Sequence, residues 1–564
     1  MDKKEIALVL SEIATLLELK GENPFRIRAY VNGARAVLGI DDLAKCIKDG
    51  SLTEIEGIGE HLAEKITTLY KTGKLPYYEK LKKSTPAGLL ELLKVQGLGP
   101  KKVKMLYQKL KIRTLNDLKQ AAANGKIAKL KGFGAKTEKN ILLSLEHKES
   151  YQKRSLWWDA WKIGEPILKH LKSMRGVKEA EICGSVRRKL ETIGDLDFLV
   201  ASNDPEPVID WFTSLGTTVQ AQGETKVSIR LKSGMQMDLR IVEPKDYIYA
   251  LIYFTGSKEH NIKLRNLALK KGWSLSEYGF EGAKIPSPKT EEAFYQTLGL
   301  SYIPPELREN LGEIEAAAKH KIPRLIESKD IRGTFHNHTT ASDGKNTLKE
   351  MVEGAIQLGW EYIGISDHSK SSFQANGLTE EKLLEQVAAI RALNASKKGK
   401  IHIFCGTECD ILPDGKLDFS KSALDQLDFV IVSIHNAMQQ DEKTMTRRII
   451  KALEHPSTTM LGHATGRLLL QREPYKVNMG KVIDAAIANQ KIIEINGHPK
   501  RLDMDWRLWH QAIEKGLVCC INCDAHAVEQ LAFYETGIHI ARKGWLTKED
   551  VINTLPLKDI QKRL

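Results

Sequence analysis

In the first 150 positions, apolar residues recur every three or four residues, a spacing that lines one face of a helix. The clearest run comprises Ile6, Leu10, Ile13, Leu16 and Leu17. The opening letters MDKKE mix acidic and basic side chains, so the N-terminus predicts a helix rather than a signal peptide. No apolar run in the chain approaches the roughly 18 residues of a membrane span, and we expect no membrane partner.

Three short segments interrupt this helical pattern and repeat the motif apolar-x-Gly-apolar-Gly, at residues 55–59, 95–99 and 130–134. Glycine permits a tight turn, and the backbone N–H groups that start the next helix can hold a phosphate. One such segment could be an ordinary helix C-cap. Three of them favour helix-hairpin-helix (HhH) modules that bind the DNA backbone regardless of sequence. The residues predicted to contact DNA are Gly57, Gly59, Lys65, Gly97, Gly99, Lys101, Lys102, Gly132 and Gly134.

In residues 181–242, apolar and polar positions alternate as they do in β-strands. Asp195 and Asp197 begin an apolar run and, being two positions apart, point to the same face of a strand. Asp238 follows a second alternating stretch. Three carboxylates on one face repel one another unless cations lie between them, and oxygen ligands suit Mg²⁺. The sequence therefore predicts a two-metal site that activates a hydroxyl and stabilises a pyrophosphate.

A turn just upstream strengthens this prediction. Residues 184–188 read Gly-Ser-Val-Arg-Arg and offer backbone N–H groups, a hydroxyl and two guanidinium groups, a combination that suits a triphosphate. An isolated Asp-x-Asp pair is more often part of a solvated loop, and this alternative loses weight with such a turn beside it.

Residues 334–564 alternate strand-like apolar runs with helical segments, which indicates a parallel sheet and favours a barrel. Nine His, Asp and Glu residues accompany these runs, and polar residues at the carboxyl ends of barrel strands form active sites. A single histidine is more often structural, but this accumulation predicts a metal site. Imidazole and carboxylate groups suit Zn²⁺, Mn²⁺ or Fe, and clustered metals hydrolyse phosphoesters. A thiolate zinc site on Cys405, Cys409 and Cys523 is a weaker alternative because their spacing is poor.

Composition separates these regions further. A chain of 564 residues suggests about three to five domains, and 42% hydrophobic with 28% charged residues is typical of a globular protein. The net charge of +13 is concentrated in residues 101–150, where 13 Lys and Arg face 4 Asp and Glu, and such a patch favours a polyanion partner. Residues 334–564 hold 11 of the 16 histidines. Seven irregularly spaced cysteines favour a reducing, cytoplasmic setting.

Residues 183–197 resemble the palm of the family X DNA polymerases, with Gly-Ser-x-Arg-Arg and Gly-Asp-x-Asp in register. Residues 253–257 are similar to that family's Tyr-Phe-Thr-Gly-Ser motif, and the resemblance extends over residues 1–315. It implies that Asp195, Asp197 and Asp238 are catalytic carboxylates that bind Mg²⁺ or Mn²⁺. It also implies a nucleotide site made by Gly184, Ser185, Arg188, Tyr253, Phe254, Gly256, Asn261 and Arg265. Without the flanking Thr-Gly-Ser, Tyr253 and Phe254 would be assigned to the core.

In the same family, the first HhH segment belongs to a small domain that binds a 5′-phosphate, and some members use a lysine there to form a Schiff base with a sugar aldehyde. Lys65 falls at that place. His61 stands where polymerase beta has a lysine. Lyase activity is therefore one alternative for Lys65, and contact with a phosphate or simple surface exposure is the other.

The histidine-rich part resembles the polymerase-and-histidinol-phosphatase (PHP) domain, whose motifs begin with His-x-His. The resemblance implies a site for about three Mn²⁺, Zn²⁺ or Fe ions. The implied ligands are His336, His338, Asp343, His368, Glu408, His435, His463, Asp524 and His526. No ligand position is missing, so we expect an active hydrolase. Asp367, His402, His455, His498 and His510 match no ligand position and are expected to be structural or to support the ligands.

Together the two resemblances are those of a bacterial or archaeal family X DNA polymerase with a C-terminal PHP domain. We expect a monomer that fills short gaps in DNA repair, including base excision repair, on gapped or primed DNA with a 5′-phosphate and with dNTPs as substrates. The PHP half is expected to be a 3′–5′ exonuclease, with AP endonuclease activity or 3′ end cleaning as further options. Two alternatives remain: a PHP half that hydrolyses small phosphate esters, and a DNA end-binding scaffold with a degenerate palm.

The expected fold is multidomain: helical HhH modules, an α+β nucleotidyltransferase palm and thumb, and an α/β PHP domain built as a distorted TIM-like barrel. The predicted segments are residues 1–85 for a 5′-phosphate-binding domain, 86–150 for a second HhH domain, 151–242 for the palm, 243–315 for the thumb, 316–333 for a linker and 334–564 for the PHP domain.

Overall fold

The chain divides into two compact units, Met1–Gln152 and Lys153–Leu564. The computed structural model describes residues 1–38, 40, 42–93, 95, 98–130, 132–134, 137–139, 141–142, 145, 154–282, 287–396 and 400–564. Among these residues, no helix combines the length and the apolar character that crossing a membrane requires.

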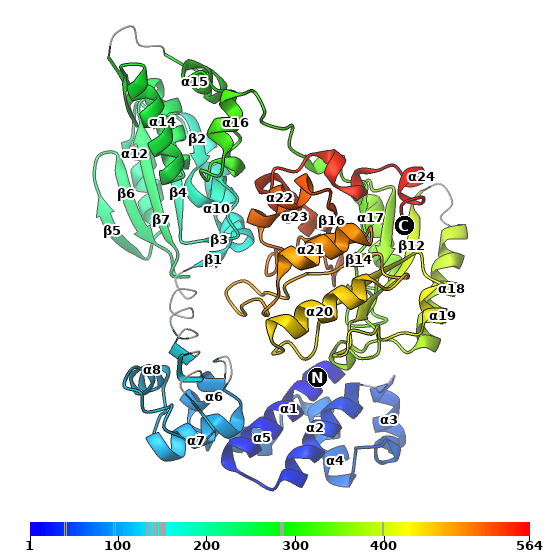
Figure 1. The fold of residues 1–564 in the computed structure, drawn as a ribbon. Helices are drawn as coiled ribbons and strands as arrows, with labels where there is room; N and C mark the ends of the chain where they lie inside the picture. The colour runs from blue at the N-terminus through cyan, green and yellow to red at the C-terminus, as the bar shows by residue number, and fades with distance from the viewer. Residues whose placement is uncertain are drawn as a thin grey trace. The chain divides into compact units, whose positions relative to one another are not determined.

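The first unit is helical in its described residues (Figure 1), and its buried apolar side chains form two hydrophobic cores. The predicted first helix is α1, and Asp2 and Glu5 form a capping box at its start. Ile6, Leu10 and Ile13 are fully buried because their spacing brings them onto one side of this helix. The helices are α1 (Lys3–Lys20), α2 (Pro24–Leu38), α3 (Leu43–Asp49), α4 (Glu60–Thr72), α5 (Pro76–Lys83), α6 (Ala87–Leu93), α7 (Pro100–Leu110) and α8 (Leu115–Ala123), with the 3₁₀ turn η1 (Ser51–Glu54).

The three glycine segments share one backbone hydrogen-bond pattern. In each one, the N–H of the apolar residue between the glycines donates to a carbonyl three residues earlier: Ile58 to Ile55 at 3.0 Å, Leu98 to Val95 at 3.1 Å and Phe133 to Leu130 at 3.0 Å. Gly59 and Gly99 then begin α4 and α7 with nearly identical backbone angles, φ −82° and ψ 169° against φ −83° and ψ 170°. No side chain caps either helix start. The N–H groups of Leu62 and Lys102, the third residue of each helix, donate to the carbonyls of Gly59 at 2.8 Å and Gly99 at 3.0 Å, so only the N–H groups before them lack an intrahelical acceptor.

The second unit begins with a five-stranded sheet in the order β2-β4-β7-β6-β5, in which β4 and β7 are parallel. In β4, Leu196, Phe198 and Val200 pack in a core with α10 and α12, while Asp195 and Asp197 lie on the opposite face. The elements are β1 (Ser155–Leu156), α10 (Trp157–Ser173), β2 (Val177–Ile182), α11 (Gly184–Arg187), β3 (Thr192–Ile193), β4 (Asp195–Ser202), α12 (Glu206–Ser214), β5 (Thr218–Gln222), β6 (Lys226–Arg230) and β7 (Gln236–Val242).

Helices α13 to α16 and a small hairpin form the thumb, around a core that includes Leu264, Phe294 and Tyr295. The carboxylate of Glu291 ties this part to the palm, because it accepts hydrogen bonds from Arg187 at 2.9 and 2.7 Å and from Arg308 at 2.8 Å. The elements are η2 (Pro244–Asp246), α13 (Tyr247–Thr255), α14 (Lys258–Lys270), β8 (Ser274–Ser276), β9 (Gly279–Glu281), α15 (Glu291–Thr297), η3 (Pro305–Leu307) and α16 (Glu313–Ala318).

The described C-terminal residues form a parallel sheet of seven strands, β10 to β16, in chain order. Asn337 and Ala525 form a parallel bridge beyond the first and last strands, so the two edges meet. The predicted distorted TIM-like barrel is therefore confirmed, with seven strands instead of the usual eight. The strands are β10 (Gly333–Thr334), β11 (Tyr362–Ile365), β12 (His402–Asp410), β13 (Phe429–Ser433), β14 (Met460–Leu461), β15 (Ile492–Asn496) and β16 (Val518–Asn522).

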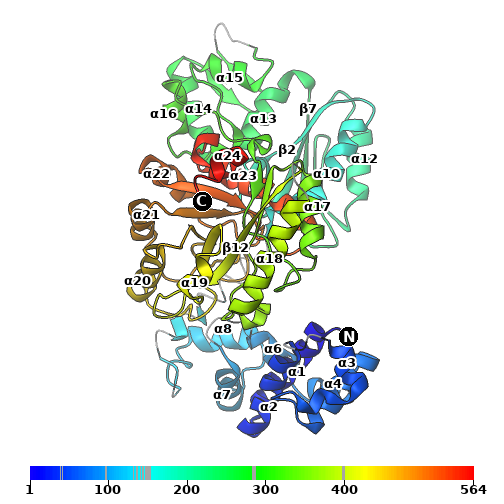
Figure 2. The same ribbon diagram turned by 90° about the vertical axis from the view of Figure 1, so that its right-hand side faces the viewer.

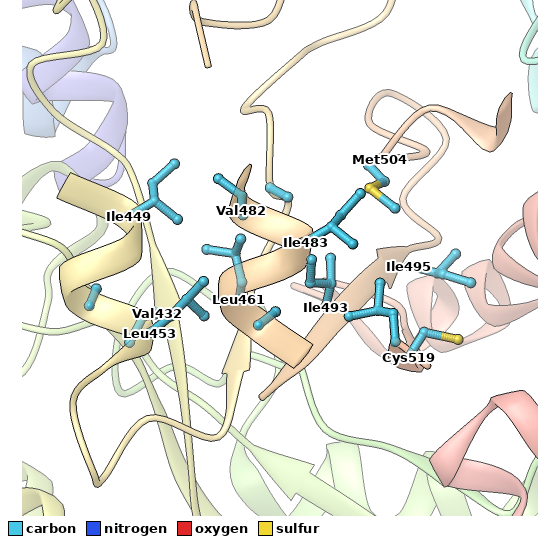
Figure 3. Close-up of a cluster of buried hydrophobic side chains, with 14 of the residues drawn as sticks. Val432, Ile449, Leu453, Leu461, Val482, Ile483, Ile493, Ile495, Met504 and Cys519 are labelled. Carbon is cyan, nitrogen blue, oxygen red and sulfur yellow. The ribbon is translucent and has the colours of Figure 1, made fainter. Parts of the chain in front are cut away.

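Alternate residues of the barrel strands face two different cores. The interior is filled by Phe335, Tyr362, Phe404, Phe429, Ile431, Met460, Ile492 and Cys520. The other residues pack against helices outside the sheet, and Figure 2 shows these helices around the strands. Figure 3 shows Leu453 and Val482 of two such helices beside Val432, Leu461 and Ile493. The outer helices are α17 (Leu348–Gln357), α18 (Glu380–Ser396), α19 (Lys421–Leu424), α20 (Glu442–Leu453), α21 (Met479–Ala488), α22 (Trp509–Glu514) and α23 (Tyr534–Lys543), and α24 (Leu557–Ile560) ends the fold.

The segment predicted to be a linker, residues 316–333, is packed on both sides. Leu325 is buried in the thumb core, whereas Ile326 and Ile331 are buried in the barrel core. Leu325 and Ile326 are adjacent in the sequence but enter different cores, so the segment contributes to both cores. Within the second unit, the palm, thumb and barrel are consequently joined by a packed connection.

Candidate active sites: a carboxylate triad and a histidine cluster

The structure brings Asp195, Asp197 and Asp238 together on the palm. Strands β4 and β7 are parallel neighbours, and their register places Asp197 directly beside Asp238. Each residue offers a carboxylate oxygen, and these oxygens lie within 4.8 Å of one another. Ser228 and Gln236 orient Asp238, the latter through an amide that donates to Oδ2 at 2.9 Å. The geometry and the oxygen donors fit divalent cations such as Mg²⁺.

Burial and mutual repulsion act on these carboxylates. Burial first, and then the charges of Asp195 and Asp238, raise the pKa of Asp197 to about 7. Burial and Asp238 likewise raise the pKa of Asp195. A bound cation would favour the ionised form of both groups, so the electrostatics of the triad agree with a cation site.

Gly184 lies against the triad at the start of α11. Its φ of +57° is in the left-handed region, and a β-carbon at this position would come within 2.3 Å of Oδ2 of Asp197. The N–H of Cys183, one residue earlier, donates to the backbone carbonyl of Asp197 at 2.7 Å. Glycine is therefore required by both conformation and space. The backbone hydrogen bond from Cys183 to Asp197 holds the turn that contains Ser185 beside β4.

The two arginines of this turn have different surroundings. Arg187 donates to both oxygens of Glu291 and, at 2.8 Å, to the hydroxyl of Thr255. The guanidinium of Arg187 is thus engaged by Glu291 and Thr255 of the thumb, and of the two arginines only Arg188 was predicted to belong to the nucleotide site. Arg188 contacts Glu309 at 3.2 Å and the Thr255 carbonyl, and its charge acts to lower the pKa of Asp197. Arg188 is accordingly the arginine that lies at the triad.

Tyr253, Asn261 and Arg265, predicted to contact the nucleotide, are neighbours on α13 and α14. The amide of Asn261 donates to the Tyr253 carbonyl at 2.7 Å, and the Arg265 guanidinium lies 5.3 Å from the centre of the Tyr253 ring. All three side chains line one pocket. Tyr253, Asn261 and Arg265 therefore belong to one continuous surface of the thumb.

Phe254 and Gly256 connect this surface to the palm. The guanidinium of Arg240, two positions after Asp238 on β7, lies 5.4 Å from the centre of the Phe254 ring. Gly256 has a φ of +71°, and a β-carbon there would come within 3.0 Å of Nη1 of Arg188. Arg240 was missed by sequence reasoning, although the period of two from Asp238 places it on the acidic face.

The predicted PHP ligands gather at one rim of the barrel, because the carboxyl ends of parallel strands meet there. Each ligand ends or follows an element of the barrel. His336 and His338 follow β10, Asp343 lies in the loop before α17, His368 follows β11, Glu408 lies near the end of β12, His435 follows β13, His463 follows β14, and Asp524 and His526 follow β16.

These side chains form overlapping groups whose ligand atoms lie within 4.8 Å of one another: His338 with Asp343, His368 and His526; His336 with His338 and Asp524; and His368 with Glu408 and His435. Glu408 is central, because its Oε1 lies 2.8 Å from Nε2 of His463 and its Oε2 lies 2.9 Å from Nδ1 of His368. No group found among the described residues contains a cysteine. The alternative thiolate site is therefore not formed, and Cys405, Cys409 and Cys523 are free and buried.

Several buried atoms of this cluster make no hydrogen bond of suitable geometry, although Nδ1 of His368 and Oε2 of Glu408 lie within ion-pair distance of each other. They are Nε2 of His336, Nδ1 and Nε2 of His338, Nδ1 of His368, Nδ1 of His463 and Oε2 of Glu408. Burial of unsatisfied polar atoms is costly, whereas imidazole nitrogens and carboxylate oxygens are the ligands that Zn²⁺, Mn²⁺ and Fe accept. The residues present thus fit divalent metal ions.

The carboxylates of this cluster are ionised because neighbouring imidazole and guanidinium groups stabilise their charge. Burial by itself would raise the pKa of Glu408, but His435, His336 and His368 outweigh it and hold this pKa well below its ordinary value. For Asp524, His336 and Arg501 outweigh burial in the same way. Both carboxylates are ionised at neutral pH and available to metals.

Sequence reasoning missed two carboxylates that hold ligand histidines. Glu494, in the middle of β15, lies 2.6 Å from Nδ1 of His336 and accepts a hydrogen bond from the N–H of His463 at 2.7 Å. Asp410 lies 3.2 Å from Nδ1 of His435. A carboxylate behind an imidazole fixes the orientation of the ring. Glu494 could have been found from the sequence, because it is a charged residue inside an otherwise apolar strand.

Arg501 was also missed, because it lies in an irregular loop without a periodic pattern. Its Nε lies 2.9 Å from Oδ2 of Asp524, and its Nη1 is buried without a hydrogen-bond partner. A guanidinium beside metal ligands can contact a phosphate oxygen. Asp367, by contrast, accepts from Thr339 at 2.8 Å and Gln386 at 2.6 Å, which agrees with a structural or supporting role.

The predicted DNA-binding residues lie on the HhH turns and the helices that follow them. Gly57 and Gly132 have φ values of +91° and +87°, which only glycine adopts readily, while Gly134 accepts from the N–H of Glu138 at 3.0 Å. Gly97 lies outside the described residues.

The lysines differ in their surroundings. Lys65 donates to the His61 carbonyl at 3.0 Å and lies 5.7 Å from the centre of the Tyr77 ring. Lys102 lies 5.7 Å from the centre of the Phe133 ring, which joins α7 to the third turn. Lys101 is exposed in the first turn of α7. A phosphate at the start of α7 would therefore meet a lysine.

Four family models match the chain. They are "Helix-hairpin-helix domain" at residues 1–75, "SAM-like Helix-hairpin-helix tandem" at 89–147, "DNA polymerase beta thumb" at 250–309 and "PHP domain" at 334–498. The HhH, thumb and PHP regions inferred from motifs and seen in the fold are thus matched independently.

The "DNA polymerase/3'-5' exonuclease PolX" of Bacillus subtilis (strain 168) is 38% identical over 568 residues, which cover 100% of this chain and 99% of the relative. DNA polymerase lambda of Rattus norvegicus is 27% identical over 290 residues, 45% of this chain and 48% of the relative. A protein named "Probable phosphatase", from Thermoanaerobacter sp. (strain X514), is 26% identical over 230 residues, 39% of this chain and 89% of its own length. With similarity at this level along both halves, the chain belongs to the bacterial family X DNA polymerases that carry a C-terminal PHP domain.

Proposed function

We propose that this chain is a DNA repair polymerase that fills short gaps and also trims 3′ ends. The observation that carries the polymerase activity is the register of β4 and β7, which places Asp197 beside Asp238 with Asp195 within reach. The proposed substrates are a dNTP and gapped or primed DNA with a 5′-phosphate. The proposed working form is a monomer.

The residues around the triad have separate tasks in this proposal. Asp195, Asp197 and Asp238 would hold Mg²⁺ or Mn²⁺, which would supply charge stabilisation for attack by the 3′-hydroxyl and departure of pyrophosphate. Arg188 and the turn at Ser185 hold the triphosphate through charge-assisted and backbone hydrogen bonds. Tyr253 and Phe254 contact the sugar, and Asn261 and Arg265 lie toward the base and the template.

The first unit holds the DNA by its backbone. The uncapped starts of α4 and α7, with Lys65 and Lys101 nearby, suit phosphate groups of any sequence. In this proposal the first module takes the 5′-phosphate at the far side of the gap. Lys65 contacts that phosphate, and a Schiff-base reaction at Lys65 is a separate alternative.

The PHP half is proposed to hydrolyse phosphodiesters at the 3′ end. The observation that carries this activity is the set of buried imidazole and carboxylate atoms that gather around Glu408 within reach of a common metal ion. Mn²⁺, Zn²⁺ or Fe ions bound by these atoms would polarise the phosphoryl group and activate water. Glu494 and Asp410 hold the imidazoles in position, and Arg501 is placed to contact the phosphate. AP endonuclease activity and 3′ end cleaning are further activities of the same site.

A second candidate for the PHP half is hydrolysis of a small phosphate ester. Residues 334–564 have no net charge, and the Thermoanaerobacter relative is named a probable phosphatase. A non-catalytic scaffold is disfavoured because all three palm carboxylates are present and adjacent.

The polymerase assignment is tested with the double variant Asp195→Ala, Asp197→Ala. We expect nucleotide addition to gapped DNA in Mg²⁺ or Mn²⁺ to fall by more than about 100-fold, because charge stabilisation in the transition state is lost. Asp204→Ala, an exposed aspartate after β4, is the matched control. Undiminished primer extension by the double variant would overturn the assignment.

The exonuclease assignment is tested with His336→Ala on labelled single-stranded DNA in Mn²⁺. Loss of a ligand and of its contact to Glu494 is expected to lower 3′ degradation by at least about 100-fold, while primer extension persists. His510→Ala, outside the cluster, is the control. Retained nuclease activity in His336→Ala would favour the small-molecule phosphoesterase instead.

A further inference from the structure

Lys543 is a buried lysine at the C-terminal end of α23, in the PHP half. Its side chain is fully inaccessible, and Nζ donates to the carbonyl of Arg188 at 3.0 Å, to the carbonyl of Glu306 at 3.2 Å and to Oε1 of Glu309 at 3.0 Å. All three acceptors belong to the palm and thumb. An ammonium group is costly to bury unless its donors are satisfied, and here the polymerase half supplies every acceptor.

The same acceptor atom also serves Arg188. Oε1 of Glu309 lies 3.2 Å from Nε of Arg188, whose Nη1 donates to the Thr255 carbonyl. Lys543 therefore contacts the backbone carbonyl of Arg188 directly. It also shares the carboxylate oxygen of Glu309 with the Arg188 guanidinium. The ring of Trp506, also in the PHP half, lies 4.3 Å from Nζ and closes the site around the lysine. The arginine beside the polymerase triad is thus held by a residue of the hydrolase half.

We propose that Lys543 is a positioning residue for nucleotide addition: by holding Arg188 and Glu309, the PHP barrel completes the dNTP site of the palm. This inference rests on the proposed role of Arg188 at the triphosphate. It makes the barrel necessary for polymerisation in a way that is independent of hydrolysis at the histidine cluster.

The adjacent residue provides a matched control. Arg542 crosses the same interface, where it donates to Glu306 at 2.8 Å and to the Ile326 carbonyl at 2.9 Å, but it has no described hydrogen bond to Arg188 or Glu309. Loss of Arg542 weakens the contact between the halves without releasing Arg188. Comparison of the two positions therefore separates positioning from general interface stability.

The test uses the full-length protein and steady-state primer extension on gapped DNA with varied dNTP concentration. For Lys543→Met we expect the KM for dNTP to rise by about 5- to 150-fold, the usual range of coupling between sites, with kcat changed much less and 3′–5′ exonuclease activity retained. Arg542→Gln is expected to leave the KM unchanged. Glu309→Gln should raise the KM as Lys543→Met does, and the double variant should add little because both act through one contact.

The KM values of these variants decide whether Lys543 positions Arg188. An unchanged KM in Lys543→Met, or an equal rise in Arg542→Gln, would overturn it. Arg188→Ala tests separately whether Arg188 belongs to the dNTP site. If KM rises in Arg188→Ala but not in Lys543→Met, only the positioning role of Lys543 is overturned. An unchanged KM in Arg188→Ala removes Arg188 from the nucleotide site and the role of Lys543 with it. Retained exonuclease activity shows that a variant is folded, and Glu309→Gln replaces Lys543→Met if the latter fails to fold.

Discussion

The carboxylates of the two sites have opposite surroundings. Burial and neighbouring aspartates raise the pKa of Asp197 to about 7, whereas imidazole groups outweigh burial and hold the pKa of Glu408 well below its ordinary value. The difference comes from the neighbours, since like charges disfavour ionisation and opposite charges favour it. The palm triad therefore depends on arriving cations for its charge balance, and the PHP cluster already contains compensating groups.

At the residue scale, Gly184→Ala is expected to impair the polymerase alone. The added β-carbon would lie 2.3 Å from Oδ2 of Asp197, so the carboxylate must move. Displacement of a reacting group by about 1 Å can cost roughly 100-fold in rate. We expect a loss of this order in kcat/KM for nucleotide addition, measured on gapped DNA, with unchanged exonuclease activity.

Gly234→Ala is the matched control for this substitution. Gly234 also has a positive φ, +88°, but a β-carbon there meets no atom within 4 Å. Both variants carry the backbone strain of the left-handed region, and only Gly184→Ala displaces a carboxylate. Equal losses of activity in the two variants would mean that strain, not the contact with Asp197, is responsible.

At the scale of elements, the HhH turns convert a local motif into a ligand site. The hydrogen bonds from Ile58 to Ile55 and from Leu98 to Val95 close the same turn in two modules, and each following helix starts without a side-chain cap. Such a helix start carries partial positive charge and unpaired N–H groups. The glycine motif thus determines where a phosphate can approach.

Lys101→Ala is expected to weaken DNA binding equally for different sequences and to reduce the slope of log affinity against log salt by about one, because one phosphate contact is lost. Fluorescence anisotropy across a salt series measures this effect. Lys109→Ala removes an exposed lysine at the other end of α7 and is the control. A slope that falls equally in both variants would place the phosphate elsewhere than at the helix start.

At the scale of the whole molecule, the second unit combines a polymerase and a hydrolase through buried polar contacts. The pairs Arg542–Glu306 and Lys543–Glu309 connect thumb and barrel, and Arg467 of the barrel donates to Glu191 of the palm at 3.0 Å. These are charged pairs with low solvent exposure, and removing one partner leaves an uncompensated charge. The two activities are therefore parts of one folded body in residues 153–564.

Metal ions are expected to stabilise this unit. Adding Mn²⁺ to metal-stripped protein should raise the unfolding temperature of residues 153–564, because binding to the native state alone contributes about 2.7 kcal/mol at 100 times Kd. Differential scanning calorimetry measures the shift. The double variant His336→Ala, His338→Ala should lose most of it, whereas His510→Ala should keep it; an equal shift in the double variant would contradict a metal site at the barrel rim.

The sequence by itself determined the features that depend on local geometry. The period of two placed Asp195 and Asp197 on one face of β4, and the spacing of three and four predicted the buried face of α1. The HhH turns followed from glycine, which alone reaches the required backbone angles readily. Alternating strands and helices predicted the barrel, and parallel strands bring their carboxyl ends to one rim. These are properties of short segments, so a single sequence was sufficient to predict them.

Only the tertiary structure decided which charged groups meet. The register of β4 and β7 brought Asp238 beside Asp197. Of two adjacent arginines, Arg187 is occupied by Glu291 and Arg188 lies at the triad, held by Lys543 from 355 residues away. Glu494 meets His336 across 158 residues. The physical reason is that a charged side chain is stabilised by whatever partner packing brings within hydrogen-bond distance, and no local period encodes that partner.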